Sequence, residues 1–147
     1  MRVFSFAQES TRYCNYSKDK FGNELTFIIP SWSTVNEEHL KPRVKSPSMA
    51  EGVMLRLFMH AESDYLYMLE QGLTPQQARQ VLPNALKTEV VMTGFIEDWD
   101  LFFGQRARGK FTDSRGREHI SIPHPDMLAL TKPLLEEFIK RGYINGI

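Results

Sequence analysis

The chain has 147 residues, 41% hydrophobic and 24% charged, a composition that predicts one compact globular domain rather than a disordered or membrane-spanning chain. Its 18 basic and 18 acidic residues cancel, so no global attraction to nucleic acid or anionic lipid is expected and any anion site must be local. No apolar run approaches the roughly 20 residues that span a bilayer, and the first residues lack the apolar stretch of a signal peptide, so we expect a cytoplasmic protein.

Cysteine and histidine give no sign of a metal centre. Cys14 is the only cysteine, which excludes a disulfide within the chain and favours a small buried hydrophobe over a nucleophile. His39, His60, His119 and His124 are scattered rather than spaced as metal ligands, and His60 falls within a helical pattern where a structural role is the default. We therefore predict no metal site.

The opening segment, residues 2–13, is polar and cationic. It would make a poor core but a workable anion cradle, because arginine presents a rigid fork of donors to phosphate or carbonyl oxygens. The side chains that would form this cradle follow one another in the sequence: Gln8, Glu9, Ser10, Thr11 and Arg12.

The next part of the chain predicts turns and one strand. Residues 14–23 are rich in turn formers, and residues 24–30 form a β-branched and aromatic run closed by proline, which is typical of a strand. Residues 31–45 have no clean period and predict a loop with at most one short helical turn.

Two helix starts follow. Ser48 and Glu51 form a capping-box pattern, behind which apolar residues recur at helical spacing until Gly72. Thr74 and Pro75 repeat the start signal and predict a short helix that ends at residues 82–83.

The last third of the chain predicts a strand, a helix, a hairpin and a final helix. Residues 86–93 suit a strand, and residues 95–106 carry an aromatic and aliphatic pattern typical of a helix. Residues 107–122 predict a two-stranded excursion, whose four cations could bind a phosphate or form a charged, solvent-facing flap. His124 opens a final amphipathic helix that ends at Gly142. The resulting fold class is a mixed α/β (α+β) fold, a sheet packed with helices, in a single domain over residues 1–147.

Three arginines lie at the edges of the predicted elements: Arg12, Arg79 and Arg106. They could converge on the phosphate and a carbonyl of a nucleotide, since a multiply charged ligand needs fixed donors from several elements. The alternative for each one alone is ordinary surface solvation.

The opening segment, read with two later ones, resembles the flavin-dependent thymidylate synthases. The family signature is R-H-R-x-x-S, followed shortly by Ser-x-Arg-Tyr. Arg2 and Ser5 match the last Arg and the Ser of the signature, and Ser10, Arg12 and Tyr13 match the second element.

The two later segments are residues 78–88, which contain Ala-Arg-Gln-Val-Leu-Pro, and residues 93–106. The helix that His124 opens is similar to the C-terminal helix of the family, so the resemblance covers nearly the whole chain. Because Met1 stands where the signature has its His, the chain resembles an N-terminally truncated member.

The resemblance implies a homotetramer with active sites shared between subunits, and the reductive methylation of dUMP to dTMP. Methylenetetrahydrofolate would supply the carbon, FAD would carry the hydride and NADPH would reduce the flavin, with no need for an enzyme thiol. The alternative is a non-catalytic truncated homologue or partner subunit that retains a nucleotide-binding cradle.

The resemblance also implies roles for individual residues. Arg106 falls on the position held to polarise the uracil ring, and would be catalytic. Phe95, Glu97 and Leu101 depart from the family, where many members carry Asn, Arg and Asn or His. The positions implied to bind dUMP are Gln8, Glu9, Ser10, Thr11, Arg12, Arg79 and Arg106, and those implied to bind FAD are Arg2, Gln8 and His124.

Overall fold

The computed structural model describes residues 4–18, 22–41, 45–113 and 115–146. The chain divides into two compact units, one made of Met1–Ala7 with Val91–Ile147 and the other of Gln8–Val90. The single domain expected from the sequence stays a prediction. The chain contains helices and two two-stranded sheets, which confirms the predicted mixed α/β class. The first sheet pairs β1 (Ser5–Gln8) with β2 (Val90–Thr93). Among the described residues, no helix is both long and apolar enough to cross a bilayer.

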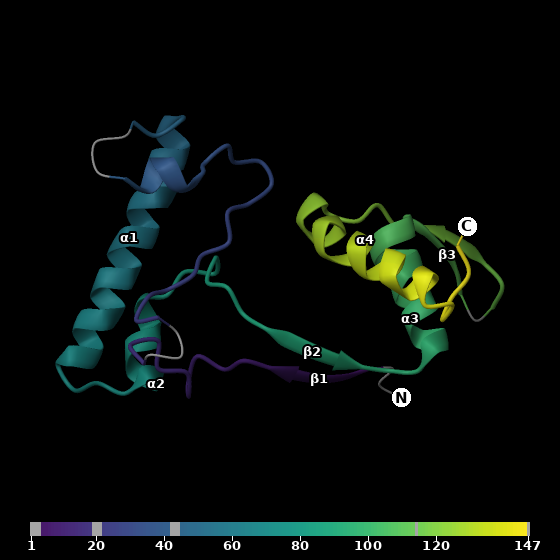
Figure 1. Ribbon diagram of the computed structural model, residues 1–147, viewed down its shortest axis with the longest axis horizontal. Helices are drawn as coiled ribbons and strands as arrows, with labels where there is room; N and C mark the ends of the chain where they lie inside the picture. The colour runs from purple at the N-terminus through teal and green to yellow at the C-terminus, as the bar shows by residue number, and fades with distance from the viewer. Residues whose placement is uncertain (1–3, 19–21, 42–44, 114, 147) are drawn as a thin grey trace. The chain divides into compact units, whose positions relative to one another are not determined.

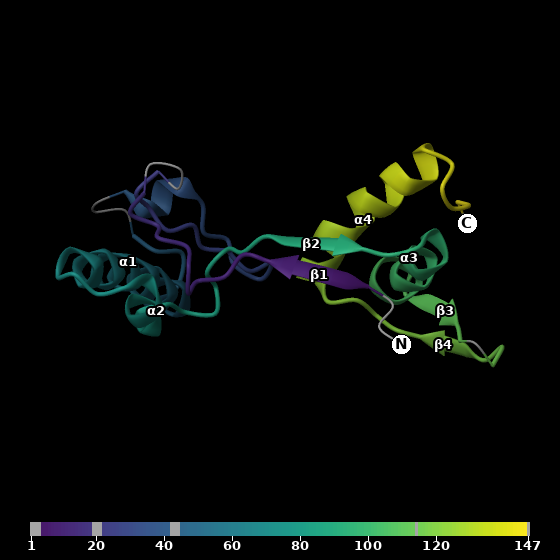
Figure 2. The ribbon, with the colours of Figure 1, turned by 90° about the horizontal axis from the view of Figure 1, so that it is seen from below.

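Unit 2 is built on the long helix α1 (Met49–Glu70), which begins and ends where the sequence predicts. The hydroxyl of Ser48 accepts the Glu51 N–H at 3.2 Å, and Gly72 leaves the helix in the left-handed region at φ +86°. The short helix α2 (Pro75–Ala78) follows and continues into a 3₁₀ turn, η3 (Arg79–Val81), beside the last turns of α1 (Figures 1 and 2).

The core of unit 2 surrounds Tyr65 of α1, whose side chain is fully buried. Its ring meets that of Tyr16 edge to face at 5.7 Å, and both pack with Leu25 and Ala78. The Tyr65 hydroxyl donates to the carbonyl oxygen of Cys14 at 3.2 Å. Burial raises the pKa of Tyr16 to about 12, and burial also raises the pKa of Tyr65. Cys14 is half-buried against this cluster, as its predicted packing role requires.

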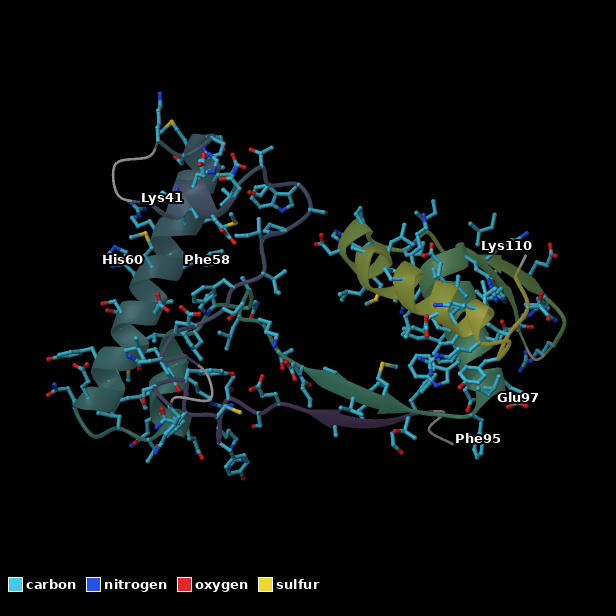
Figure 3. The ribbon with its side chains drawn as sticks, viewed as in Figure 1. Lys41, Phe58, His60, Phe95, Glu97 and Lys110 are labelled. Carbon is cyan, nitrogen blue, oxygen red and sulfur yellow. The ribbon has the colours of Figure 1, made fainter. Side chains whose placement is uncertain are left out.

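Two expectations for unit 2 are wrong. Residues 24–30 form no strand: a single antiparallel bridge joins Phe27 to Leu86, and Pro30 and Pro83 lack the N–H groups that would extend the pairing. β2 accordingly starts at Val90 instead of at the predicted residue 86. His60 lies within α1, as the helical pattern predicts; its side chain is exposed and points to the side of α1 opposite Phe58 (Figure 3), and a structural role for it stays a prediction.

A buried carboxylate, that of Glu51, ties the loop before α1 to the helix. It accepts hydrogen bonds from the hydroxyl of Ser48 at 2.6 Å and from the N–H of Thr34 at 2.7 Å. These bonds lower the pKa of Glu51 from 4.5 to about 2. The loop also contains the one short helical turn that the sequence predicts, η2 (Glu37–Leu40).

Unit 1 packs α3 (Ile96–Phe103) against α4 (Pro125–Lys140) through aromatic rings. Phe103 is fully buried, with its ring 5.1 Å from that of Phe138 and 5.8 Å from that of Trp99. The helix predicted over residues 95–106 is confirmed, but its end is a π-helical turn, η4 (Gly104–Arg108).

The predicted hairpin over residues 107–122 is confirmed as β3 (Lys110–Thr112) paired antiparallel with β4 (Glu118–Ile120), near α3 (Figure 2). The Asp113 carboxylate accepts the N–H groups of Arg115 and Arg117 at 2.9 and 3.0 Å and holds the turn. Two of the four cations in residues 107–122 form ion pairs. Arg108 pairs with Asp100 at 2.7 Å and Arg117 with Asp113 at 2.8 Å. The charged, solvent-facing flap and the phosphate site both stay predictions.

The core role of Phe103 predicts a large effect of its truncation. Phe103→Ala should lower the free energy of unfolding by about 3–5 kcal/mol, because a buried ring is lost and a cavity remains. Urea denaturation followed by circular dichroism measures this change. Phe95→Ala is the control, since that ring is 77% exposed and its loss should cost less than about 0.5 kcal/mol. Equal effects of the two variants would contradict the assigned core.

The depressed pKa of Glu51 predicts a pH-dependent contribution to stability. The carboxylate stabilises the fold above its ordinary pKa of 4.5, and this contribution disappears as the pH falls through about 2. Glu51→Gln should therefore lower the Tm near neutral pH, and the difference from wild type should shrink as the pH falls. Thermal unfolding across this range measures it, with the exposed Glu136→Gln as control. A difference that is constant with pH would be inconsistent with the assignment.

Candidate functional site

A pocket of about 680 Å³ lies within unit 2, between two segments that are far apart in sequence. Its first wall is the stretch 8–11 and its second is the stretch 79–88. The pocket brings together five of the predicted site residues. The lining consists of Gln8, Glu9, Ser10, Thr11, Arg79, Gln80, Leu82, Pro83, Asn84, Leu86 and Thr88.

Hydrogen bonds with residues 88 and 89 hold the first wall in place. The Glu9 N–H donates to the Glu89 carbonyl at 2.9 Å, and the Thr88 hydroxyl donates to the Glu9 carbonyl at 3.4 Å. Beyond β1 the chain turns, because the N–H groups of Tyr13 and Cys14 both donate to the Ser10 carbonyl at 3.0 Å. This turn leaves the side chains of residues 8–11 along one side of the pocket.

The second wall begins where α2 passes into the 3₁₀ turn η3. Arg79, the first residue of η3, is half-buried, and its Nη1 donates to the Thr11 hydroxyl at 3.4 Å. The two walls are thus joined by a hydrogen bond across 68 positions of sequence. Among the described residues this neutral hydroxyl is the side-chain partner of Arg79, so the guanidinium retains its charge and further donors for an anion.

Arg12 is not among the described lining residues; it lies beside the pocket. Its Nε and Nη2 both donate to the Gln76 side-chain oxygen at 3.3 Å, and its guanidinium carbon is 5.4 Å from the centre of the Tyr13 ring. The side chain is exposed, next to the lining residue Thr11. The predicted cradle is therefore divided between a lined pocket and an arginine on its flank.

The other predicted site residues belong to unit 1 or lie outside the described residues. Arg106 is an exposed residue of η4, and its carbonyl accepts the Thr131 hydroxyl at 2.6 Å. His124 is the N-cap of α4, where its Nδ1 accepts the Asp126 N–H at 3.3 Å. Arg2 is not among the described residues. The roles predicted for these three residues stay predictions.

The pocket's chemistry fits one phosphate and a polar ring. Arg79 supplies a cation, Glu9 a carboxylate acceptor, and Gln8 an amide that both donates and accepts, while Leu82 and Leu86 supply apolar surface. Gln80 and Asn84 also line the pocket, although the sequence pattern assigns them no role. Their positions in the sequence, next to Arg79 and Pro83, could have indicated that they line the site. A turn at Pro83 keeps the residues that follow it near the 3₁₀ turn.

The fit to a flavin dinucleotide is partial. The amide of Gln8 suits a ring edge that both donates and accepts hydrogen bonds. Arg79, however, is the one cation among the described lining residues, and a single cation is too few to bind the phosphate of a nucleotide and the diphosphate of a flavin dinucleotide together. At the start of α3, Phe95 and Glu97 are exposed and project from the helix (Figure 3). The described residues contain no group of three or more His, Cys, Asp or Glu side chains that could hold a metal ion.

Comparison with known proteins adds independent observations. A family model described as thymidylate synthase complementing protein matches residues 1–120. The flavin-dependent thymidylate synthases of Pyrococcus abyssi and Pyrococcus furiosus are each 30% identical over 105 residues, covering 71% of this chain and 38% of the relative. The chain thus spans well under half the length of these relatives.

Two kinds of solved structure share the fold. A UMP/dUMP methylase PolB from Streptomyces cacaoi, bound with 5-Br dUMP, has a TM-score of 0.61 at 21% identity and covers 95% of this chain and 58% of its own. Thymidylate Synthase X from Helicobacter pylori, with FAD and dUMP, has a TM-score of 0.52 at 17% identity, with coverages of 92% and 56%. The match of the family model over most of the sequence, including both pocket walls, shows that the chain belongs to the flavin-dependent thymidylate synthase family.

Proposed function

We propose that the pocket of unit 2 binds dUMP, and that the chain is part of a thymidylate synthase that uses FAD to convert dUMP to dTMP. The observation that carries this proposal is the link between Arg79 and Thr11, which places a cation and a hydroxyl at one pocket. The relatives named above are flavin-dependent thymidylate synthases, and both kinds of structural neighbour contain dUMP or its 5-Br derivative.

The phosphate of dUMP would bind between Arg79 and Arg12, with the hydroxyls of Ser10 and Thr11 as further donors. Charge-assisted hydrogen bonds of this kind are shorter and stronger than neutral ones. Arg79 is already oriented by Thr11, so less side-chain freedom is lost when the anion binds.

The uracil ring would be read by Gln8 and Glu9, which offer amide and carboxylate groups on the same wall. Arg106 is the proposed catalytic residue: a guanidinium at a ring carbonyl would stabilise the negative charge that develops on the pyrimidine when its C5 attacks an electrophilic carbon. The apolar side chains of Leu82 and Leu86 would contact the deoxyribose.

In the proposed reaction FAD supplies hydride transfer, with methylenetetrahydrofolate as carbon donor and NADPH as reductant. Gln8, His124 and Arg2 are the residues proposed to contact the flavin. The assembly proposed is a cytoplasmic homotetramer with shared sites. The resemblance to the family is what supports these assignments.

A second candidate function is nucleotide binding without turnover. It is favoured by the start of α3, where Glu97 and Asp98 are acidic and Phe95 is 77% exposed. Carboxylates at this place would repel the diphosphate of a flavin dinucleotide if the flavin lay there. The two candidates share the dUMP pocket and differ in whether the chain retains FAD.

The proposed pocket predicts that dUMP binding depends on Arg79. Arg79→Ala should weaken dUMP binding by roughly 10- to 100-fold, since charge-assisted bonds contribute about 1.5–3 kcal/mol each. Isothermal titration calorimetry on the full chain measures this. Arg56→Ala, which removes an exposed cation from α1 of the same unit, should leave the affinity unchanged. Equal losses in both variants, or none in either, would refute the pocket.

The flavin distinguishes the two candidates. For a working synthase, the purified chain should show visible flavin absorbance or bind added FAD, and should form dTMP when methylenetetrahydrofolate and NADPH are supplied. Glu97→Arg should tighten FAD binding if α3 faces the diphosphate, whereas Glu136→Arg on α4 should not. Binding of dUMP with no detectable affinity for FAD would leave nucleotide binding without turnover as the function.

A further inference from the structure

We propose that Gln76 is a positioning residue for Arg12, which it holds at the flank of the pocket while leaving the charge of the guanidinium available to the phosphate. This inference rests on the proposed binding of dUMP. The Nε and Nη2 atoms of Arg12 both donate to the same Gln76 oxygen at 3.3 Å, across 64 positions of sequence. The contact therefore depends on the tertiary fold.

The contact uses only one edge of the guanidinium. Arginine has further N–H groups on Nη1 and Nη2, and these remain for a ligand when Gln76 occupies the Nε edge. The Tyr13 ring, 5.4 Å from the guanidinium carbon, favours the same placement through a cation–π contact. One edge and one face are thus held, and the opposite edge is left for a phosphate.

The neutrality of Gln76 is the informative part of the arrangement. Gln76 is the second residue of α2, in the first turn of a helix, where a carboxylate would interact favourably with the exposed backbone N–H groups. A carboxylate would also bind Arg12 more strongly than an amide does. Helix stability and Arg12 contact alone would both favour Glu at this position.

A carboxylate would, however, cancel the charge that makes Arg12 useful. None of the ion pairs between described residues includes Arg12, so its full charge is available. The amide restricts the arginine without neutralising it. The geometry therefore assigns Gln76 a role in phosphate affinity that neither packing nor helix stability explains.

The charge test is Gln76→Glu in the full chain, titrated by calorimetry with dUMP and with deoxyuridine, which lacks the phosphate. We expect dUMP binding to weaken about tenfold, with a shallower salt dependence, and deoxyuridine binding to stay unchanged. The Tm should be equal or higher, because the new carboxylate suits the start of α2. Gln71→Glu, an exposed position at the end of α1, adds the same charge as a control and should not affect binding.

The positioning test is Gln76→Ala, alone and combined with Arg12→Ala. Alone it should weaken dUMP binding several-fold, because Arg12 must then be ordered by the ligand; combined with Arg12→Ala it should have no further effect.

The inference is overturned if Gln76→Glu leaves dUMP affinity within twofold of wild type, if deoxyuridine affinity falls equally, or if Gln76→Ala acts the same with and without Arg12. A wild-type chain that does not bind dUMP would instead overturn the proposed function itself, and this inference with it.

Discussion

The burial of Tyr65 is the constraint on which the candidate site depends. Its ring packs against Ala78, whose side chain is fully buried, and this contact fixes the end of α2. Its hydroxyl binds the Cys14 carbonyl, which belongs to the turn that closes the first wall. Arg79 follows Ala78 directly, so one buried side chain orients both walls. The pocket is therefore an outcome of core packing more than of its own polar contacts.

The helices of this protein could be predicted from sequence because their signals are local. Three helices begin directly after the residues that signal their start, Ser48, Thr74 and His124. At each start a side chain forms a hydrogen bond with a backbone N–H group: that of Ser48 with Glu51, that of Gln77 with Thr74, and that of His124 with Asp126. The hairpin of β3 and β4 is equally local and is predicted too, whereas strands that pair with a distant segment are predicted less well. The single bridge of Phe27 forms opposite Leu86, where a proline on each segment limits its extent.

The candidate site shows the same division between local and distant causes. The cluster from Gln8 to Thr11 is visible in the sequence, and its pairing with Arg79 follows once both are compared with the family. The placement of Arg12 does not follow, because it depends on Gln76, a residue that no pattern in the opening segment indicates. The end of α3 is similar: the helical pattern is clear, but nothing local predicts the π-helical turn that carries Arg106.

In that π-helical turn, a residue of α4 holds the backbone of Arg106 by a hydrogen bond. The buried hydroxyl of Thr131 on α4 donates a hydrogen bond to the Arg106 carbonyl at 2.6 Å. The family model matches residues 1–120, yet this anchor lies beyond it. A substitution of Thr131 would therefore remove a support of the Arg106 backbone without changing any residue of the segments that the family model matches.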